Sequence, residues 1–539
     1  MVPKLDDDRW VGLPALEART VPAAIRRSVA AVPDRIALTD EVASLTYAEL
    51  DSAARRFSAG LAGLGAAKGT RVLTMMDNHA DSVVVWLALS YLGAVSVPVN
   101  TAYVGPTLEH VMGHSDSTIA VVDADHLGAV QRAAAAVGGL RTIVVRTGDD
   151  MDRHGLPSVA QLLQSAELSE PVPVDPWDLH SVMYTSGTTS LPKGVLVPHA
   201  LTYTRAAIYQ ESCDVGSLVE LCVLPFFHVV GQCRGVVGPL LMQGRAVMRS
   251  RFSASRFWTD CRDEGVTSCV LMGAMARFLM LQPPADTDRE HNVRVIHTAG
   301  ADLTGFSSRF GVQVSSGYGM TEIGTITRGD DPDPGGCGTV HPEIDYQLVD
   351  EHERPVPTGT AGELVVRNTV PWTFTTGYLG DPAATTDLWR NLWLHTGDLF
   401  IEADDGTLTF VGRSKFVIRR RGENISPSQV EVELCTHPGV AEAAVVGVPA
   451  DEGEEEVLAL VVAQPGTRTD PAELLEHLSG RLPYFMIPRY VEFREALPKT
   501  PTHKIDVGAL RVSATTTDAW DRDQAGIRVT RAGVVRAGS

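Results

Sequence analysis

Apolar residues recur along most of the chain in two patterns, the three-to-four-residue spacing of helices and the short runs of buried strands. Residues 48–64 have the helical pattern and residues 118–122 form a short β-rich run; this alternation continues to about residue 310. It predicts an α/β architecture with largely parallel sheets. Residues 82–99 are the most apolar run, but two serines, a glycine and a proline interrupt it. They predict a buried helix followed by a buried strand, not a membrane span.

The pattern changes in the second half of the chain. Residues 169–177 carry prolines and are predicted to be a linker. After Gly335 the segments YQLVD, GELVVRN and GTLTFVGR predict a β-rich unit of short strands and turns. From Ser426 a block of helix, strand and helix predicts a compact α+β domain. From about Val512 the chain is polar with little periodicity, which predicts a loosely held tail.

These patterns, together with the motifs below, divide the chain into a large domain, a small domain and a tail. The chain has 539 residues, too many for one core. The expected boundaries are 1–414 for the large N-terminal domain, about 335–414 for its β-rich subdomain, 415–511 for the small C-terminal domain and 512–539 for the tail.

Charge and cysteine content narrow the partners and the compartment. The formal net charge is −20, which argues against binding to nucleic acid or anionic membranes. A phosphate-bearing ligand would therefore be held by local donors. Seven cysteines without a CxxC pair indicate neither a disulfide framework nor a zinc site, and favour a reducing compartment. The acidic N-terminus lacks an apolar signal core, so we expect a cytoplasmic protein.

The segment MYTSGTTSLPKGVLVPH, residues 183–199, has the composition of a phosphate-binding loop. Glycines allow close backbone approach, while hydroxyls and N–H groups can surround phosphate oxygens. It is not a Walker A loop, because Pro192 replaces the second glycine and Gly194 follows Lys193. A surface turn between strands is the simpler alternative. The chain has only six lysines against 40 arginines, which draws attention to Lys193.

TSGTTSLPKG resembles the phosphate loop of the adenylate-forming superfamily, which contains acyl-CoA synthetases, peptide-synthetase adenylation domains and luciferases. Ser190 stands where the family usually has glycine. Further matches follow in the family's order, from LTYAEL at residues 45–50 to Lys504, and so cover most of the chain. The stretches FFHVVGQC and RRGENIS look most like the carnitine/crotonobetaine-CoA ligase-like branch.

The resemblance implies a nucleotide site. SSGYGMTE, residues 315–322, resembles the motif in which Tyr318 stacks on adenine, Thr321 bonds the α-phosphate and Glu322 holds Mg²⁺. AGADL, with an unusual Asp302, resembles the segment against the adenine, and HTGD places Asp398 at the ribose hydroxyls. The implied nucleotide-binding residues are Thr185, Ser186, Gly187, Thr188, Thr189, Lys193, Gly300, Ala301, Asp302, Ser316, Gly317, Tyr318, Gly319, Thr321, Asp398, Arg413 and Lys504.

The resemblance also implies a moving small domain. Residues 412–427 resemble the domain junction, with Lys415 at the hinge and Phe416 where the family commonly has aspartate. LPKTPTHKID resembles the catalytic loop, with Lys504 as its lysine and His503 in place of glycine. The implied catalytic residues are Lys504, Thr321, Glu322 and His228, and the implied CoA-channel residues are Arg421, Gly422 and Glu423. His228 can equally be a structural histidine, and the run Arg419 to Arg421 a solvated face.

The resemblance therefore implies an ATP-dependent acyl-CoA synthetase, an AMP-forming acid–thiol ligase that uses ATP, Mg²⁺ and CoA. An α-amino acid is a weak candidate substrate, because the stretch Phe252 to Ser255 lacks the aspartate that would hold its amine. The apolar residues 270–281 favour a bulky apolar acid, such as a precursor in specialised metabolism, or are plain core. Delivery to a carrier protein or a separate thiolating enzyme, a luciferase-like oxygenase and a noncatalytic nucleotide-binding regulator are the alternatives. The oligomeric state, including a homodimer, is left open.

Overall fold

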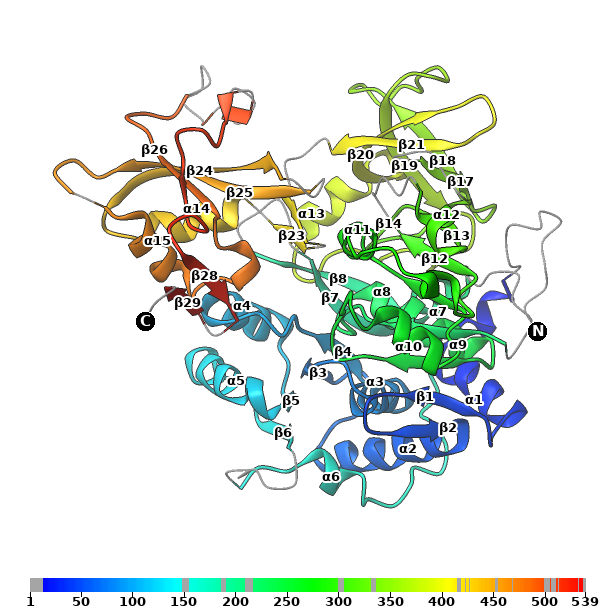
Figure 1. Ribbon diagram of the computed structural model, residues 1–539. Helices are drawn as coiled ribbons and strands as arrows, with labels where there is room; N and C mark the ends of the chain where they lie inside the picture. The colour runs from blue at the N-terminus through cyan, green and yellow to red at the C-terminus, as the bar shows by residue number, and fades with distance from the viewer. Residues whose placement is uncertain are drawn as a thin grey trace.

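The computed structural model describes most of the chain. The described residues are 13–147, 155–185, 191–208, 217–298, 305–330, 336–413, 418–421, 423–425, 427–450, 454–467, 469–498, 505, 510–511, 513–531 and 533–536. Figure 1 shows a large domain with the small C-terminal domain, in orange to red, beside helices α4 and α5. The predicted α/β class with a large and a small domain is confirmed.

Two sheets form the large domain. One has the order β6-β5-β3-β4-β7-β8, and every pair is parallel except β7 with β8. Its strands are β3 (Arg71–Met75), β4 (Val95–Pro98), β5 (Ile119–Asp123), β6 (Thr142–Arg146), β7 (Leu179–Thr185) and β8 (Lys193–Pro198). The apolar run of residues 82–99 is α3 (Ala80–Leu92) followed by β4, as predicted, and α3 is buried on all sides.

The second sheet joins the α/β part to the β-rich subdomain. Its order is β18-β19-β20-β21-β17-β16-β13-β12-β11-β9-β10-β1-β2, parallel from β13 to β1 and antiparallel elsewhere. The strands are β1 (Ile36–Thr39), β2 (Ser44–Thr46), β9 (Val219–Cys222), β10 (Arg245–Met248), β11 (Ser268–Val270), β12 (Val295–Thr298), β13 (Gln313–Ser316), β16 (Thr327–Asp330), β17 (Gly336–Val340), β18 (Ile344–Val349), β19 (Gly362–Asn368), β20 (Leu394–Glu402) and β21 (Leu408–Arg413).

Helices of the large domain cover these sheets. They are α1 (Val21–Ala31), α2 (Tyr47–Gly63), α3, α4 (Gly105–Ser115), α5 (Ala124–Val137), α6 (Val159–Leu162), α7 (His199–Ala207), α8 (Val229–Gln232), α9 (Gly238–Leu241), α10 (Phe257–Asp263), α11 (Gly273–Met280), α12 (Phe306–Phe310) and α13 (Pro382–Leu388). Helix α2 shows how the local sequence determines a helix. A capping box between Thr46 and Glu49 begins it, and Leu50, Phe57 and Leu61 share its buried face.

The small domain is built on the sheet β24-β25-β26-β27 with α14 and α15. Its elements are α14 (Pro427–Cys435), β24 (Val440–Pro449), β25 (Glu455–Ala463), α15 (Pro471–Leu478), β26 (Tyr490–Phe493) and β27 (Trp520–Asp521), with a hairpin of β22 (Ile418–Arg420) and β23 (Glu423–Ile425) at its start. Side chains alternate along β24, so that Val445 packs in the core that contains both helices while Val446 packs on the opposite face.

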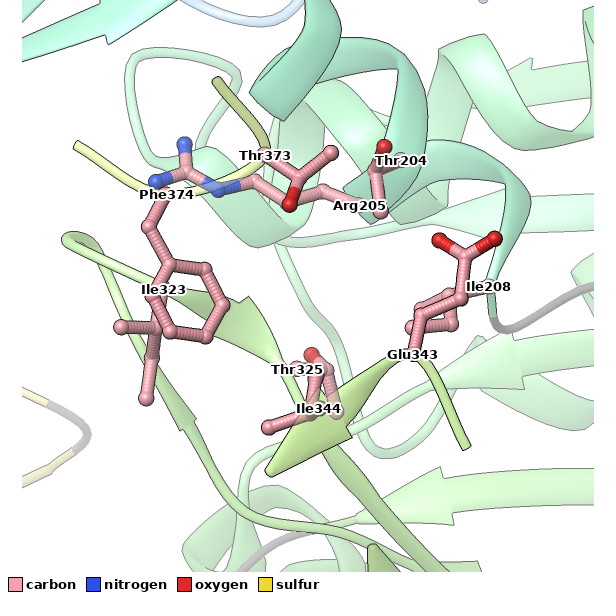
Figure 2. A pocket seen from close by; sticks show the side chains of 9 residues that line it. All are labelled: Thr204, Arg205, Ile208, Ile323, Thr325, Glu343, Ile344, Thr373 and Phe374. Atoms are coloured by element: carbon pink, nitrogen blue, oxygen red, sulfur yellow. The ribbon is translucent and has the colours of Figure 1, made fainter. Parts of the chain in front are cut away.

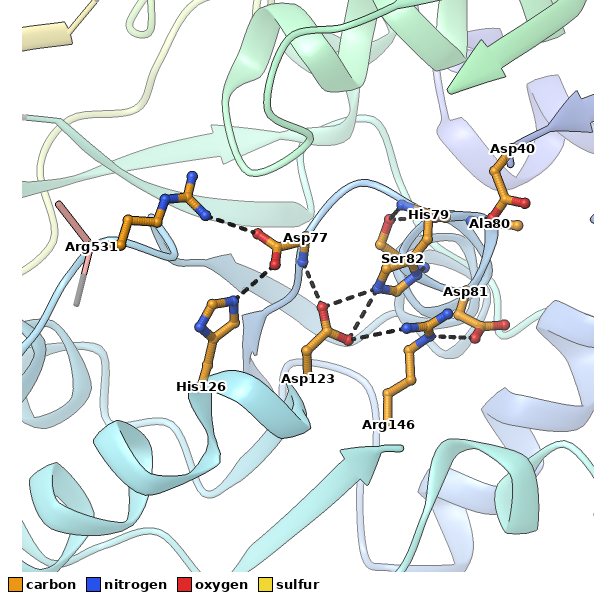
Figure 3. Close-up of polar contacts among 10 residues, drawn as sticks. All are labelled: Asp40, Asp77, His79, Ala80, Asp81, Ser82, Asp123, His126, Arg146 and Arg531. Atoms are coloured by element: carbon orange, nitrogen blue, oxygen red, sulfur yellow. Dashed lines mark hydrogen bonds and ion pairs between the residues drawn. The ribbon is translucent and has the colours of Figure 1, made fainter. Parts of the chain in front are cut away.

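The expected loose tail is wrong for residues 513–531 and 533–536. Strand β27 pairs with β26, and the hairpin of β28 (Ile527–Thr530) and β29 (Gly533–Arg536) packs Ile527 into the core. Arg531 in this hairpin lies 3.7 Å from Asp77 of the large domain (Figure 3). The sequence pattern missed these strands because they are short and are completed by partners distant in sequence.

Two further findings concern membrane helices and cysteines. No helix within the described residues is long and apolar enough to cross a membrane. Cysteines in the described part of the chain are free thiols, and all except Cys435 are buried.

Candidate active site

The predicted phosphate loop lies between β7 and β8, an antiparallel pair at the edge of the first sheet. Thr185 ends β7, Lys193 begins β8, and these two residues pair directly. The intervening predictions, Ser186, Gly187, Thr188 and Thr189, lie outside the described residues. The Lys193 ammonium lies 3.8 Å from the Asp381 carboxylate and 5.1 Å from the ring centre of Tyr378. One predicted phosphate ligand is therefore fixed by an acid and an aromatic ring.

Tyr318 and Asp398, predicted at the adenine and the ribose, are in direct contact. The Tyr318 hydroxyl donates a hydrogen bond of 2.6 Å to Asp398 Oδ2, and both side chains are buried. The Tyr318 ring also packs edge-on against Phe400, 4.8 Å away. Strand pairing sets Arg413 opposite Asp398 through the backbone. The predictions Gly300, Ala301 and Asp302 lie outside the described residues.

The segment from Ser316 to Glu322 is a tight turn that ends in a buried carboxylate. Strand β13 ends at Ser316, Gly317 follows, and β14 (Gly319–Met320) pairs with β15 (Gly324–Thr325) across Thr321 and Glu322. A Cβ on Gly319 would lie 2.3 Å from the Gly324 carbonyl oxygen, so only glycine fits there. The Glu322 carboxylate accepts a hydrogen bond of 2.8 Å from the Tyr378 hydroxyl.

The hairpin of β22 and β23 reaches the large domain at His228. His228 lies directly before α8, is partly exposed, and its Nε2 atom lies 3.7 Å from the Glu423 carboxylate. The structure thus brings His228, a predicted catalytic residue, and Glu423, a predicted CoA-channel residue, together. Arg421, two residues before Glu423, is exposed with a positive φ of 52°, and Gly422 lies outside the described residues.

Arg420 does not lie on a solvated face, contrary to the alternative given for the run Arg419 to Arg421. It is buried, pairs with Glu456 at 2.7 Å and donates hydrogen bonds to the carbonyl oxygens of Phe485 and Ile487. Burial lowers its pKa to about 10. Alternation along β22 turns this side chain inward, so that Arg420 is part of the small-domain core.

The predicted hinge residue Lys415 and the predicted catalytic residue Lys504 lie outside the described residues. Residues on either side of the predicted catalytic loop are described: Leu497 and Leu510 are buried with Val446, and Ile505 packs against them. That cluster lies on the face of the small-domain sheet opposite α14 and α15.

Sequence and structure comparisons agree with this geometry. Residues 25–379 match the family described as AMP-binding enzyme, and residues 429–504 match the AMP-binding enzyme C-terminal domain. This chain belongs to the AMP-binding enzyme family. It is 30% identical over 481 residues to the crotonobetaine/carnitine–CoA ligase of Salmonella paratyphi A, covering 86% of this chain and 92% of that protein.

Solved structures of related enzymes have the same fold. A fatty acyl CoA synthetase of Mycobacterium tuberculosis is 27% identical, with a TM-score of 0.67 over 93% of this chain and 99% of that one. A double mutant of the Bacillus subtilis o-succinylbenzoate CoA synthetase, 23% identical, has a TM-score of 0.79 over 93% of this chain and 99% of that one. The prediction of an AMP-forming acyl-CoA synthetase is confirmed, and these matches leave the acid unspecified.

Glu322 of this AMP-binding enzyme fits the predicted Mg²⁺ role. Magnesium takes oxygen ligands, usually one or two carboxylates together with phosphates and water. An ionised carboxylate has several acceptor positions, so the hydrogen bond from Tyr378 leaves Glu322 able to hold a cation as well. Its burial also reduces competition from bulk water. We therefore keep Glu322 as the residue that would hold the ion.

Arg205 is a buried cation near the candidate site of this AMP-binding enzyme. It belongs to none of the sequence motifs. It lies on α7, and its guanidinium nitrogens have no hydrogen-bond partner among the described residues. Burial lowers its pKa to about 10, while Cys233 and Glu322 act in the opposite direction. Figure 2 shows its side chain along a cavity that also borders Ile323 and Phe374 and has room for about one water molecule. The sequence signal that could have identified Arg205 is its position as an arginine in the otherwise nearly uncharged helix HALTYTRAA.

A second polar cluster lies at the carboxyl ends of β3 and β5, where Asp77, Asp123 and His126 place ligand atoms within 4.8 Å of one another (Figure 3). Both carboxylates already have partners. Asp77 contacts His126 at 3.2 Å, and Asp123 contacts His79 at 3.0 Å and Arg146 at 3.9 Å. These contacts account for the cluster as a set of structural ion pairs.

Proposed function

We propose that this AMP-forming ligase uses Tyr318 and Asp398 to hold adenosine, Lys193 and Glu322 to hold phosphates and Mg²⁺, and Lys504 to activate the acid. The observation that carries the proposal is the 2.6 Å hydrogen bond between Tyr318 and Asp398. These residues belong to separate motifs, and their contact brings the two motifs together. A buried carboxylate that accepts a hydroxyl hydrogen bond is well suited to accept ribose hydroxyls.

In the first half-reaction a carboxylate oxygen attacks the α-phosphorus of ATP. The bond from that phosphorus to the bridging oxygen of the β-phosphate breaks, and pyrophosphate leaves. A carboxylate is a poor electrophile because its leaving group would be oxide, whereas the acyl-adenylate has AMP as its leaving group. Negative charge develops on phosphate oxygens, so Lys193 and Lys504 act mainly through electrostatic stabilisation. Magnesium, when bound, would neutralise further phosphate charge.

In the second half-reaction the sulfur of a thiol attacks the acyl carbon. The carbon–oxygen bond to AMP breaks, AMP leaves, and the thiol proton is lost to a base or to solvent. The 3.7 Å approach of Glu423 to His228 supports an arrangement in which the small domain faces the thiol side of the site. Rotation about Lys415 would exchange this hairpin for the Lys504 loop.

For the substrate we propose an apolar carboxylic acid other than an α-amino acid. Within residues 270–281, Ala276 and Leu279 are fully buried in a core cluster with Phe257, in agreement with the plain-core alternative for these two positions. Phe252 and Ala254 pack against the same cluster. The relatives share one fold but are named for acids that differ widely, from a small polar acid to fatty acids. The side chains that line the acid pocket, and not the fold, therefore determine which acid is used.

The test is a panel of short, branched, aromatic and long-chain acids, scored separately for pyrophosphate release without CoA and for thioester with CoA. We expect acid-dependent pyrophosphate release for at least one class and thioester only when CoA is added. Adenylate without thioester would favour a carrier-bound pantetheine or a separate thiolating enzyme. Oxygen consumption after adenylation would favour a luciferase-like oxygenase, and no exchange with any acid would favour a regulator. We propose the cytoplasm as the place of this activity, where ATP and CoA are available.

A further inference from the structure

Tyr378 lies between Lys193, proposed to hold phosphates, and Glu322, proposed to hold Mg²⁺. Its hydroxyl donates a hydrogen bond of 2.8 Å to the Glu322 carboxylate. The face of its ring meets the Lys193 ammonium, 5.1 Å from the ring centre. One side chain therefore contacts both the phosphate-loop lysine and the carboxylate suited to Mg²⁺.

The backbone holds Tyr378 against the strand that Lys193 begins. Residues around it bond to β8 in a strand-like manner: Leu379 N–H donates to the Gly194 carbonyl oxygen at 2.8 Å, and Leu196 N–H donates to the Gly377 carbonyl oxygen at 2.9 Å. Tyr378 itself forms an antiparallel bridge with Val195. Tyr378 and Lys193 thus share one rigid support.

The carboxylate side of the contact is fixed as well. Thr375 N–H, three residues before Tyr378, donates to the Glu322 carbonyl oxygen at 2.7 Å. The Tyr378 hydroxyl is a hydrogen-bond donor, and its bond to Glu322 can hold the carboxylate in one orientation.

We propose that Tyr378 is a positioning residue that sets the Glu322 carboxylate in register with the Lys193 ammonium, so that phosphates and Mg²⁺ meet a prearranged site. This inference rests on the roles proposed above for Lys193 and Glu322. Groups that are already oriented before the substrate binds lose less free energy in ordering, and a misplacement of about 1 Å can cost about 10²-fold in rate. The hydroxyl contacts Glu322 and the ring contacts Lys193, so substitutions can remove one contact without the other.

Two substitutions distinguish the contribution of the hydroxyl from that of the ring. Tyr378→Phe removes the hydroxyl and keeps the ring, so the Mg²⁺ concentration for half-maximal ATP binding should rise about tenfold, as expected for a lost hydrogen bond to a charged group. Metal-independent binding of ATP should change little. Tyr378→Leu removes both, so ATP binding should weaken in the absence of Mg²⁺ as well. Binding is measured by calorimetry on the full chain without acid substrate, and pyrophosphate exchange is measured alongside.

Tyr346→Phe is the matched control, because the Tyr346 hydroxyl donates to Glu402 at 2.7 Å in the β-rich subdomain, away from the site. It should leave the Mg²⁺ dependence unchanged. The double variant Tyr378→Phe with Glu322→Gln should lose no more Mg²⁺ affinity than Glu322→Gln alone.

The outcomes separate this inference from the proposed function. If Glu322→Gln weakens Mg²⁺-dependent binding but Tyr378→Phe matches Tyr346→Phe, the coupling is wrong while the metal role stands. Additive losses in the double variant would also overturn the coupling. If Glu322→Gln leaves the Mg²⁺ dependence unchanged, both the metal role and the coupling fail. Thermal unfolding of each variant identifies a folding defect, and a Tyr378→Phe chain that is folded like the wild type but shifted in Mg²⁺ dependence supports the inference.

Discussion

The Nε2 atom of His228 lies 3.7 Å from the carboxylate of Glu423, although His228 belongs to the large domain and Glu423 to the hairpin that begins the small one. The contact places the first hairpin of the small domain against the residue that directly precedes α8. One scaffold can serve two half-reactions if the small domain exchanges the surface at this position by rotation.

The hinge should matter for only one of the half-reactions. Lys415→Pro restricts the backbone at the junction, so we expect near-normal pyrophosphate release and a loss of thioester formation of at least tenfold. Both steps are measured on the same preparation with one acid. Lys415→Ala, which leaves the backbone free, is the control and should retain both. Equal loss of the two half-reactions in Lys415→Pro would contradict a hinge at this position.

Lys504 should be required for adenylation. By comparison with the loss of one preorganised donor, Lys504→Ala should lower acid-dependent pyrophosphate release by a factor on the order of 10² to 10³. The variant should still bind preformed acyl-adenylate, because the nucleotide contacts remain. Lys499→Ala, five residues earlier in the same loop, should lose much less. Unchanged pyrophosphate release in Lys504→Ala would remove this lysine from the mechanism.

Asp398 should contribute to ATP affinity through its charge. Asp398→Asn weakens the hydrogen bonds that a carboxylate accepts, which are worth ~1.5–3 kcal/mol each, so the KM for ATP should rise about 10- to 100-fold. ATP–pyrophosphate exchange measures this change. Asp404→Asn, an exposed acid in the following turn, should leave the KM unchanged. An Asp398→Asn enzyme with the wild-type KM would contradict the ribose assignment.

Buried histidines should make the fold sensitive to mild acid. Burial lowers the pKa of His199 to about 3, and His180, 4.7 Å away, also has a pKa well below its usual value. Between about pH 6.5 and pH 3 the unfolded chain binds a proton at His199 that the folded chain does not, so stability falls as the pH falls, by up to ~1.4 kcal/mol per pH unit. Melting temperatures at pH 7 and pH 5 should differ less in His199→Gln than in the wild type. The exposed His352→Gln should behave like the wild type.

Local sequence patterns predicted the elements well where packing follows from periodicity. The helix-then-strand reading of residues 82–99 is correct because that segment is apolar on every face and therefore buried. The motifs likewise selected Tyr318, Asp398 and Glu322, which the fold brings to one region. These predictions depend on residue type and order, which the sequence contains directly.

Other features depend on contacts between distant segments. The ordered tail is completed by strand β26, where Tyr490 pairs with Asp521 and Val491 pairs with Trp520, and by the core around Ile527. Arg420 and Arg421 are neighbours in sequence, yet a strand places the first in the core against Glu456. Tyr378 belongs to none of the motifs, and its proposed role follows only from its position between Lys193 and Glu322.

The central claim is that the acid's own oxygen attacks the α-phosphorus of ATP. It is tested most directly by supplying a turnover-competent acid labelled with ¹⁸O in its carboxylate, together with ATP and CoA, and analysing the products by mass spectrometry. Attack at the α-phosphorus followed by thiol attack at the acyl carbon predicts one ¹⁸O atom in AMP and none in pyrophosphate. Label in inorganic phosphate, with ADP as the nucleotide product, would contradict it.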